Sequence, residues 1–203
     1  MTITKAMLLS AMDRIAAAMD RQFDALNSAD GALGDGDLGV TMTRGMRAIQ
    51  DLKADLPDDM GQILLACAQA FTKSSGSSYG TLMATGLMSA AKAVKGQQEI
   101  EPEDLPGLIA GARDKMQARG KAELGGKTVL DSLDYLARAL AGAEAGVENK
   151  AAAAAQAVDQ ALDDFRDKPA TVGRARIFGD KSIGLDDPGM LAMQSVVRAA
   201  VDA

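Results

Sequence analysis

Three aspartates gather within a glycine-rich stretch, residues 30–45, which reads DGALGDGDLGVTMTRG. The carboxylates belong to Asp30, Asp35 and Asp37, and the glycines around them are Gly31, Gly34, Gly36 and Gly39. Because glycine tolerates positive φ and close backbone approach, such a stretch can aim several carboxylates at one point. Carboxylates that converge without histidine or cysteine suit a hard cation, and Mg²⁺ fits best where phosphate oxygens complete its coordination shell. The pattern turns helical after Gly39, where free N–H groups would favour an anion, so the stretch predicts a Mg-nucleotide site.

Two simpler explanations compete with a metal-nucleotide site. Aspartate and glycine are common in ordinary turns, and this chemistry alone does not decide between a turn and a site. An EF-hand calcium loop would need acids at positions 1, 3 and 5, glycine at 6 and glutamate at 12. Counted from Asp30, position 3 is Ala32, position 6 is Asp35 and position 12 is Thr41. The EF-hand is therefore excluded, and the turn stays open.

The composition narrows the classes of protein to which the chain can belong. With 203 residues and no long linker, it is expected to form one domain over residues 1–203. The formal net charge is −6, aromatic residues make up 3% and tryptophan is absent, so no nucleic-acid partner is expected. No apolar run approaches a membrane span, and residues 1–11 do not read as a signal peptide, so no membrane partner is expected. The single cysteine, Cys67, fits a reducing cytoplasm, which is the expected location.

Histidine is absent from the sequence. Its absence excludes Ser-His-Asp and Cys-His catalysis, zinc sites that use histidine, and a phosphohistidine relay within this chain. If the protein moves phosphoryl groups, it does so by positioning and metal electrostatics, which is how such transfer is generally catalysed. A general base or a covalent substrate anchor of the histidine type would have to come from a partner.

Hydrophobic periodicity predicts helices along almost the whole chain and no sustained strand alternation, so the predicted fold class is all-α. The first helix is expected over residues 4–26, with Asn27 and Ser28 ending it before an acidic loop. Seven more helices are expected over residues 39–52, 60–71, 82–94, 102–116, 129–140, 151–165 and 188–200.

Two further loops offer groups that could bind phosphate. The turn KSSGSSYGT contains Ser74 and Ser75 and opens a helix, which supplies N–H and hydroxyl donors, although plain N-capping explains it when it is taken alone. The loop GRARIFGDKSIGLDDPG carries Arg174, Arg176 and Lys181. Three cations could hold a phosphate, although a solvated charged loop is the simpler explanation on its own.

The sequence GGKT at residues 125–128 is similar to the end of a phosphate-binding P-loop. That motif needs four residues between its glycines and a strand in front of it. Here five residues separate Gly120 from Gly126, and a helical pattern precedes them. The P-loop is therefore rejected in favour of a glycine loop that leads into the helix over residues 129–140.

Four separated motifs now stand in order along the chain: D-x(4)-DGDLG, SSG-x-x-YGT, RGKAELGGKT and GRAR-x-x-GDKSIG-x-x-DPG. Together they resemble the L subunits of dihydroxyacetone kinases, the nucleotide-binding half of a two-part kinase, over nearly the whole chain. The resemblance implies an all-α antiparallel barrel of about eight helices. It also implies that ADP or ATP binds at one end of the barrel, in the loops between helices.

The same resemblance implies roles for particular residues. Asp30, Asp35 and Asp37 match the ligands of two Mg²⁺ ions that bridge the nucleotide phosphates. Arg174 matches an arginine at the nucleotide, so these four residues are the expected catalytic set. The other matches line the nucleotide: the helix start at Leu38, Gly39, Val40 and Thr41, the serines Ser74 and Ser75, the adenine side at Gly120 and Val129, and the closing turn at Asp187, Pro188 and Gly189.

Three positions depart from the family pattern. Leu38 stands where histidine is common, Thr41 where asparagine is common, and Gly126 where aspartate is common. Leu38 takes a polar group away from the metal ligands, so the phosphate contacts are expected to differ. Because all three aspartates are present, Mg-nucleotide binding is still expected.

In this family a separate K subunit holds the ketose on a histidine as a hemiaminal, which a chain without histidine cannot do. The resemblance therefore implies a chain that presents a nucleotide phosphate to a short-chain ketose held by a K-type partner. Two phosphoryl donors stay open: free ATP, or ADP kept as a cofactor and rephosphorylated by a phosphotransferase-system phosphocarrier.

Other functions stay open as well. One is an ATP-dependent kinase subunit for erythrulose or another tetrose, and another is a non-catalytic nucleotide-sensing module that regulates, for example, a transcription factor. The three aspartates favour catalysis over sensing, and the length of the chain disfavours a relative of the fatty-acid kinases. The sequence does not determine the oligomeric state, and a homodimer stays open.

Overall fold

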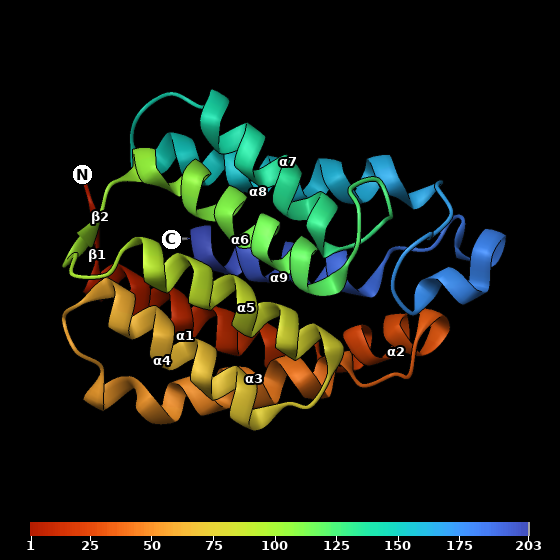
Figure 1. The fold of residues 1–203 in the computed structure, drawn as a ribbon, viewed down its shortest axis with the longest axis horizontal. Coiled ribbons are helices and arrows are strands. Elements are labelled where there is room, and N and C mark those ends of the chain that lie inside the picture. Colours follow the sequence, from red (N-terminus) through yellow and green to blue (C-terminus); the bar gives the residue numbers. More distant parts are fainter. Residues whose placement is uncertain (203) are drawn as a thin grey trace.

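The computed structural model describes residues 1–202, and most of them are helical (Figure 1). The helices described are α1 (Lys5–Arg21), α2 (Phe23–Leu33), α3 (Leu38–Leu52), α4 (Met60–Ser74), α5 (Ser78–Ala93), α6 (Leu105–Gly120), α7 (Val129–Gly142), α8 (Val147–Arg166) and α9 (Pro188–Val201). Three short 3-10 helices join them: η1 (Lys53–Asp55), η2 (Pro102–Asp104) and η3 (Ala175–Ser182). A two-residue antiparallel pair, β1 (Ile3–Thr4) and β2 (Glu99–Ile100), places Ile3 opposite Ile100. The prediction of an all-α fold is confirmed.

One predicted boundary is wrong, and it concerns the acidic stretch. The first predicted helix is divided at Gln22, and its second part, α2, continues through Asn27 and Ser28 to Leu33. Asn27 does not break the helix because its side-chain oxygen accepts the Val40 N–H of the next helix at 3.3 Å. The side chain thus has a partner outside its own helix and does not compete with its own backbone. Asp30 consequently lies in the last turn of α2 and not in a loop.

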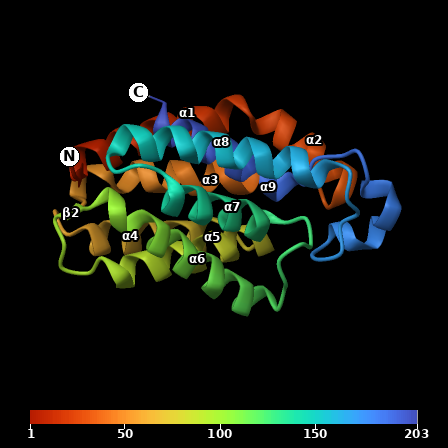
Figure 2. The same cartoon turned by 90° about the horizontal axis from the view of Figure 1, so that it is seen from above.

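The long helices lie side by side along one direction (Figures 1 and 2). Contacts between helices run in order from α1 through α3, α4, α5, α6, α7 and α8 to α9, and α9 packs back against α1. Helix α2 packs on α3 and α9. The specific expectation of a barrel stays a prediction. None of the helices described over residues 1–202 has both the length and the apolar character needed to cross a lipid bilayer.

Methionines and small residues fill much of the space between the helices. Met19, Met42, Met60 and Met190 are fully buried, as expected for flexible side chains that fill irregular gaps between helices. Helices α3 and α4 pack closely at Gly45, where a Cβ would lie 2.3 Å from the Phe71 ring of α4. The core therefore requires a small residue at this crossing.

The two ends of the bundle differ. The β1–β2 pair lies at one end, and the segment after α2 and the segments that precede α7 and α9 lie at the other, on the right in Figure 1. The first residues of α3, α5, α7 and α9, which are Leu38, Ser78, Val129 and Pro188, all line one cavity at this second end. Alternate helices of the bundle thus begin at the same place. Their N-terminal dipoles favour negative charge there.

Candidate functional site

The structure brings the three aspartates together at the junction of α2 and α3. Their carboxylate oxygens lie within 4.8 Å of one another. Asp30 comes from the last turn of α2, and its Oδ2 accepts the backbone N–H of Asp37 at 2.8 Å. Asp35 and Asp37 are exposed, whereas Asp30 is partly buried. An oxygen-only cluster with open sides suits Mg²⁺, which commonly binds one or two protein carboxylates together with phosphate oxygens.

Glycine is required at two positions of this junction. A Cβ on Gly34 would lie 2.4 Å from Oδ1 of Asp30, so any larger residue would displace that carboxylate. Gly36 has a φ of +77°, in the left-handed region that glycine adopts without strain. The glycines between the carboxylates therefore set the geometry of the cluster, as the spacing predicts.

The four residues predicted to contact the nucleotide at the start of α3 do not all face the cavity. Leu38 lines the cavity beside the carboxylates, and its side chain belongs to the buried core. Gly39 instead faces α2, where a Cβ would lie 2.3 Å from the Phe23 carbonyl oxygen. The N–H of Val40 is bonded to Asn27, and that of Thr41 donates to the Asp37 carbonyl at 2.9 Å. In this structure Leu38 is therefore the member of the set with direct access to the cavity.

The serine turn contributes a cluster of hydroxyl groups. Thr41 Oγ1 lies 3.3 Å from Ser75 Oγ and donates to Ser77 Oγ at 3.0 Å, and Ser75 Oγ donates to Ser77 Oγ at 3.0 Å. Ser77 also caps α5 by accepting the Gly80 N–H at 3.0 Å, and it lines the cavity. Ser74 lies apart from this cluster, since its hydroxyl bonds the Phe71 carbonyl of its own helix. Ser77 belongs to the serine turn that the sequence marks as a hydrogen-bond donor to phosphate, although the family resemblance assigns only Ser74 and Ser75 to the nucleotide.

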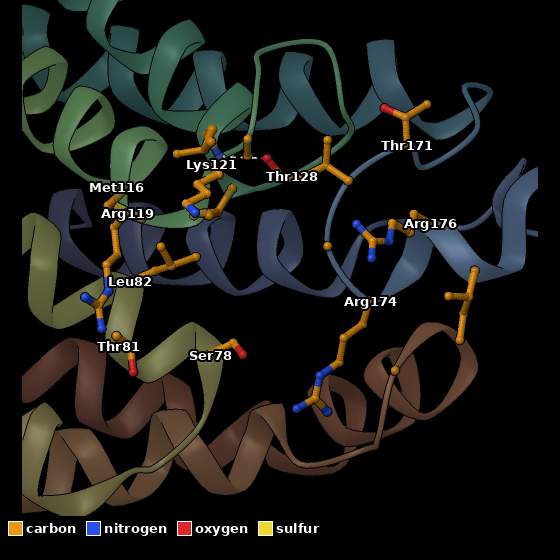
Figure 3. Close-up of a pocket in the computed structure, with 18 of the residues that line it drawn as sticks. Ser78, Thr81, Leu82, Met116, Arg119, Lys121, Thr128, Thr171, Arg174 and Arg176 are labelled. Atoms are coloured by element: carbon orange, nitrogen blue, oxygen red, sulfur yellow. Dashed lines mark hydrogen bonds between the residues drawn. The ribbon is translucent and has the colours of Figure 1, made fainter.

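A cavity of about 1030 Å³ opens beside the carboxylates (Figure 3). Arg119 and Lys121, at the end of α6, lie on one side of it, and Arg174 and Arg176 lie on another. Its walls also include the predicted Gly120 and Val129 and the apolar residues Leu82, Met116, Leu130 and Phe178. The cavity thus combines apolar walls with cations.

Arg174 reaches the aspartates directly. Its guanidinium forms an ion pair with Asp35, and both side chains are about half exposed. Arg174, which is expected at the nucleotide, thus contacts one of the three aspartates expected to bind the metal. Arg176 also lines the cavity, and among the described residues it forms none of the ion pairs.

The DPG turn closes a smaller cavity of about 160 Å³, which shares Asp35, Val129 and Arg174 with the larger one. Asp187 is buried and caps α9 by accepting the Met190 N–H at 2.9 Å. Burial raises the pKa of Asp187 to about 7. The Gly189 carbonyl accepts the hydroxyl of Tyr79 at 3.0 Å, and burial raises the pKa of that tyrosine. The turn is thus fixed to α5.

The GGKT segment does not act as a P-loop in this structure. Helix α6 and not a strand precedes it, as predicted, and Lys127 is absent from the walls of both cavities described. The Lys127 side chain is buried, its ammonium bonds three backbone carbonyls, and burial lowers its pKa. At Gly126 a Cβ would lie 2.5 Å from the Val172 side chain, so Val172 occupies the space that an aspartate would need.

Comparison with known proteins places these features in a family. The model of the DAK2 domain family matches residues 32–202. The ADP-binding subunit DhaL of PEP-dependent dihydroxyacetone kinase 1 from Listeria innocua is 30% identical over 165 residues, which cover 81% of this chain and 79% of that protein. The corresponding DhaL subunit of Escherichia coli K12 is 29% identical over 208 residues, which cover 98% of this chain and 99% of that protein.

A solved structure shares the fold. The dihydroxyacetone kinase of C. freundii, solved in complex with AMP-PNP and Mg²⁺, matches with a TM-score of 0.76 at 21% identity, and the match covers 98% of this chain and 34% of that one. The two sequence relatives are described as subunits of a kinase, as the four motifs indicate. The chain belongs to the DAK2 domain family.

Proposed function

We propose that this chain is the Mg-nucleotide-binding subunit of a two-component dihydroxyacetone-type kinase, and that it transfers a phosphoryl group to a short-chain ketose on a K-type partner. The observation that carries the proposal is the position of the carboxylate cluster. Asp30, Asp35 and Asp37 lie within 4.8 Å of one another at a cavity on which four helices begin and into which Arg174 reaches. Carboxylates, helix N-termini and an arginine together match a metal-bound polyphosphate.

Each part of the site has a task in this proposal. The three aspartates hold Mg²⁺, with two ions expected, and the bound metal neutralises charge on the transferring phosphoryl group. Arg174 shares that task, and Ser77 and the start of α5 donate to phosphate oxygens. Gly120 and Val129 line the adenine side, where Leu82 and Met116 supply apolar surface.

The chain needs a partner that holds the ketose, because it contains no histidine to anchor it. We favour ADP as a retained cofactor that a phosphotransferase-system protein rephosphorylates. Support comes from the similarity to PEP-dependent ADP-binding subunits, which extends over nearly the full length of the Escherichia coli subunit. Free ATP as the donor, with erythrulose or another tetrose as substrate, is the competing outcome.

The substitution Asp35→Ala tests the metal site. We expect it to weaken MgADP binding by at least about tenfold, because a metal ligand is lost while the helices keep their packing. Isothermal titration calorimetry measures the affinity, and circular dichroism checks the helical content. Asp51→Ala is the matched control, since Asp51 is an exposed acid near the other end of α3. Unchanged MgADP affinity in the Asp35 variant would refute the site.

A second experiment tests the reaction. Mass spectrometry of the purified protein shows whether ADP is retained, and a transfer assay with a K-type subunit compares dihydroxyacetone with erythrulose. Retained ADP and PEP-dependent transfer would support the retained-cofactor mechanism. Transfer from free ATP alone would replace it with the ATP-dependent one. Nucleotide binding without transfer to either ketose would favour a sensing module.

A further inference from the structure

Lys127 of the GGKT segment is one of the most thoroughly buried cations of the residues described. Its side chain is 1% exposed, and its Nζ donates to the carbonyls of Arg166, Lys168 and Ser182 at 2.9, 2.9 and 2.8 Å. An ammonium has three N–H donors, so all of them are used. Burying a charge is costly unless it is fully bonded. The three bonds offset that cost and fix the lysine to the backbone of Arg166, Lys168 and Ser182.

The three carbonyls lie at the two ends of one segment, residues 166–183, which we call the arginine loop. Arg174 lies near the middle of this segment and reaches the carboxylate cluster, and Figure 3 shows its side chain directed away from the loop backbone. The base of the loop is closed twice, since the Ala170 N–H donates to Ser182 Oγ at 2.7 Å and the Gly184 N–H donates to the Arg166 carbonyl at 2.9 Å. Lys127 holds the two sides of this base together.

The segment that carries Lys127 is fixed by hydrogen bonds at the start of α7. Lys127 directly precedes Thr128, the N-cap of α7, where Thr128 and Asp131 form a capping box. The Asp131 carboxylate also accepts the Gly125 N–H at 2.5 Å, and the Gly126 carbonyl accepts the Thr171 N–H of the arginine loop at 3.2 Å. The lysine therefore connects the loop to the fixed start of a core helix.

We propose that Lys127 is a positioning residue for nucleotide binding, which fixes the arginine loop on the start of α7 so that Arg174 stays at the carboxylate cluster. The lysine itself touches neither metal nor phosphate. Without it, a loop of this length would have to be ordered when the nucleotide binds, and that ordering would cost affinity. The inference rests on the proposed function, because its main readout is MgADP affinity.

A double-mutant cycle with Arg174 separates positioning from a general loss of stability. Lys127→Met keeps the apolar stem and removes the donors, and we expect it to weaken MgADP binding by about tenfold, the size of one lost charge-assisted contact. In the Arg174→Ala background the same change should have almost no further effect, because the group that it positions is gone. Calorimetry on the four proteins gives the cycle.

Lys150 offers a matched control. It is also a buried lysine, and its ammonium donates to the carbonyls of Leu140 and Ala143 at 2.5 and 3.1 Å, at the opposite end of α7 from the site. Lys150→Met should lower the stability of the fold and leave MgADP affinity within about twofold. Equal losses of affinity in the two lysine variants would overturn the proposal, as would additive losses in the cycle.

Amide hydrogen exchange without nucleotide supplies an independent readout. Lys127→Met should speed exchange over residues 170–183 and leave α7 protected, and unchanged protection of the loop would overturn the inference. If Lys127→Met does not fold, Ser182→Ala opens the same loop base, and the same exchange and cycle results are expected. Wild-type protein that fails to bind MgADP would refute the proposed function, whereas wild-type binding that Lys127→Met leaves unchanged would refute the inference alone.

Discussion

Arg174 and Asp35 form an ion pair at the place where a divalent ion would need the Asp35 carboxylate. If these carboxylates bind a metal as proposed, the arginine competes with it for this ligand when no phosphate is present. When a phosphate is bound, the same arginine has a second anionic partner within the cavity. Under the proposed function, Arg174 therefore opposes the binding of the bare metal and supports the binding of the metal-nucleotide.

The substitution Arg174→Gln should consequently change two affinities in opposite directions. The Mg²⁺ affinity without nucleotide should rise by about 1.4- to fivefold, because a half-exposed ion pair contributes roughly 0.2–1 kcal/mol. The MgADP affinity should fall by about tenfold, since a charge-assisted contact to phosphate is lost. Titration calorimetry at low ionic strength measures both constants.

Arg176→Gln is the control for this prediction. Arg176 carries the same charge and lines the same cavity, but the ion pair with Asp35 belongs to Arg174. If the Mg²⁺ affinity depended on the general potential of the cavity, both variants would raise it equally. A fall in Mg²⁺ affinity in the Arg174 variant would contradict the competition outright.

At the scale of elements, periodicity was enough to place eight helices, because each buries one apolar face at a spacing that the sequence shows. The end of α2 could not be placed in this way. Asn27 and Ser28 have weak helix propensity, and what keeps Asn27 helical is a bond to Val40 of another helix. Such a partner is a tertiary feature, which a local pattern does not contain.

In the candidate site, too, the residues with a sequence signature could be predicted and those that act through tertiary contacts could not. The aspartates and Arg174 were found because their types and motifs are visible in the sequence, and the structure brings them together. The role of Lys127 was not found, because its acceptors are backbone carbonyls that lie 39 to 55 residues away. Backbone groups carry no sequence signature, so the residues that position a site are the hardest to predict.

Two glycines within helices allow a test of packing at the scale of elements. Gly45→Ala would place a Cβ 2.3 Å from the Phe71 ring, and overpacking of this kind costs about 1–3 kcal/mol of stability. Gly107→Ala on α6 meets no atom within 4 Å, and it should raise stability by about 0.5–1 kcal/mol through helix propensity. Denaturant unfolding measures both changes. Equal effects would show that α3 and α4 do not pack as described.

At the scale of the whole molecule, the arrangement of helices explains why one end carries the site. Helices α3, α5, α7 and α9 begin there, and the intervening helices end there or lead away from it. The site therefore draws on segments from the whole chain, from Asp30 in α2 to Gly189 in α9. A ligand that contacts all of these segments adds new contacts between elements that are far apart in the sequence.

Ligand binding should accordingly stabilise the folded molecule as a whole. At MgADP concentrations one hundred times Kd, linkage predicts about 2.7 kcal/mol of added stability. For a chain of this size that corresponds to a rise in Tm of about 5–10 °C. Because we propose that the aspartates bind the nucleotide through the metal, ADP with EDTA should give almost no rise, and Asp35→Ala should lose the rise with Mg²⁺ present. Calorimetric scans measure it, and an equal rise for ADP in EDTA would mean that the nucleotide is held without the carboxylate cluster.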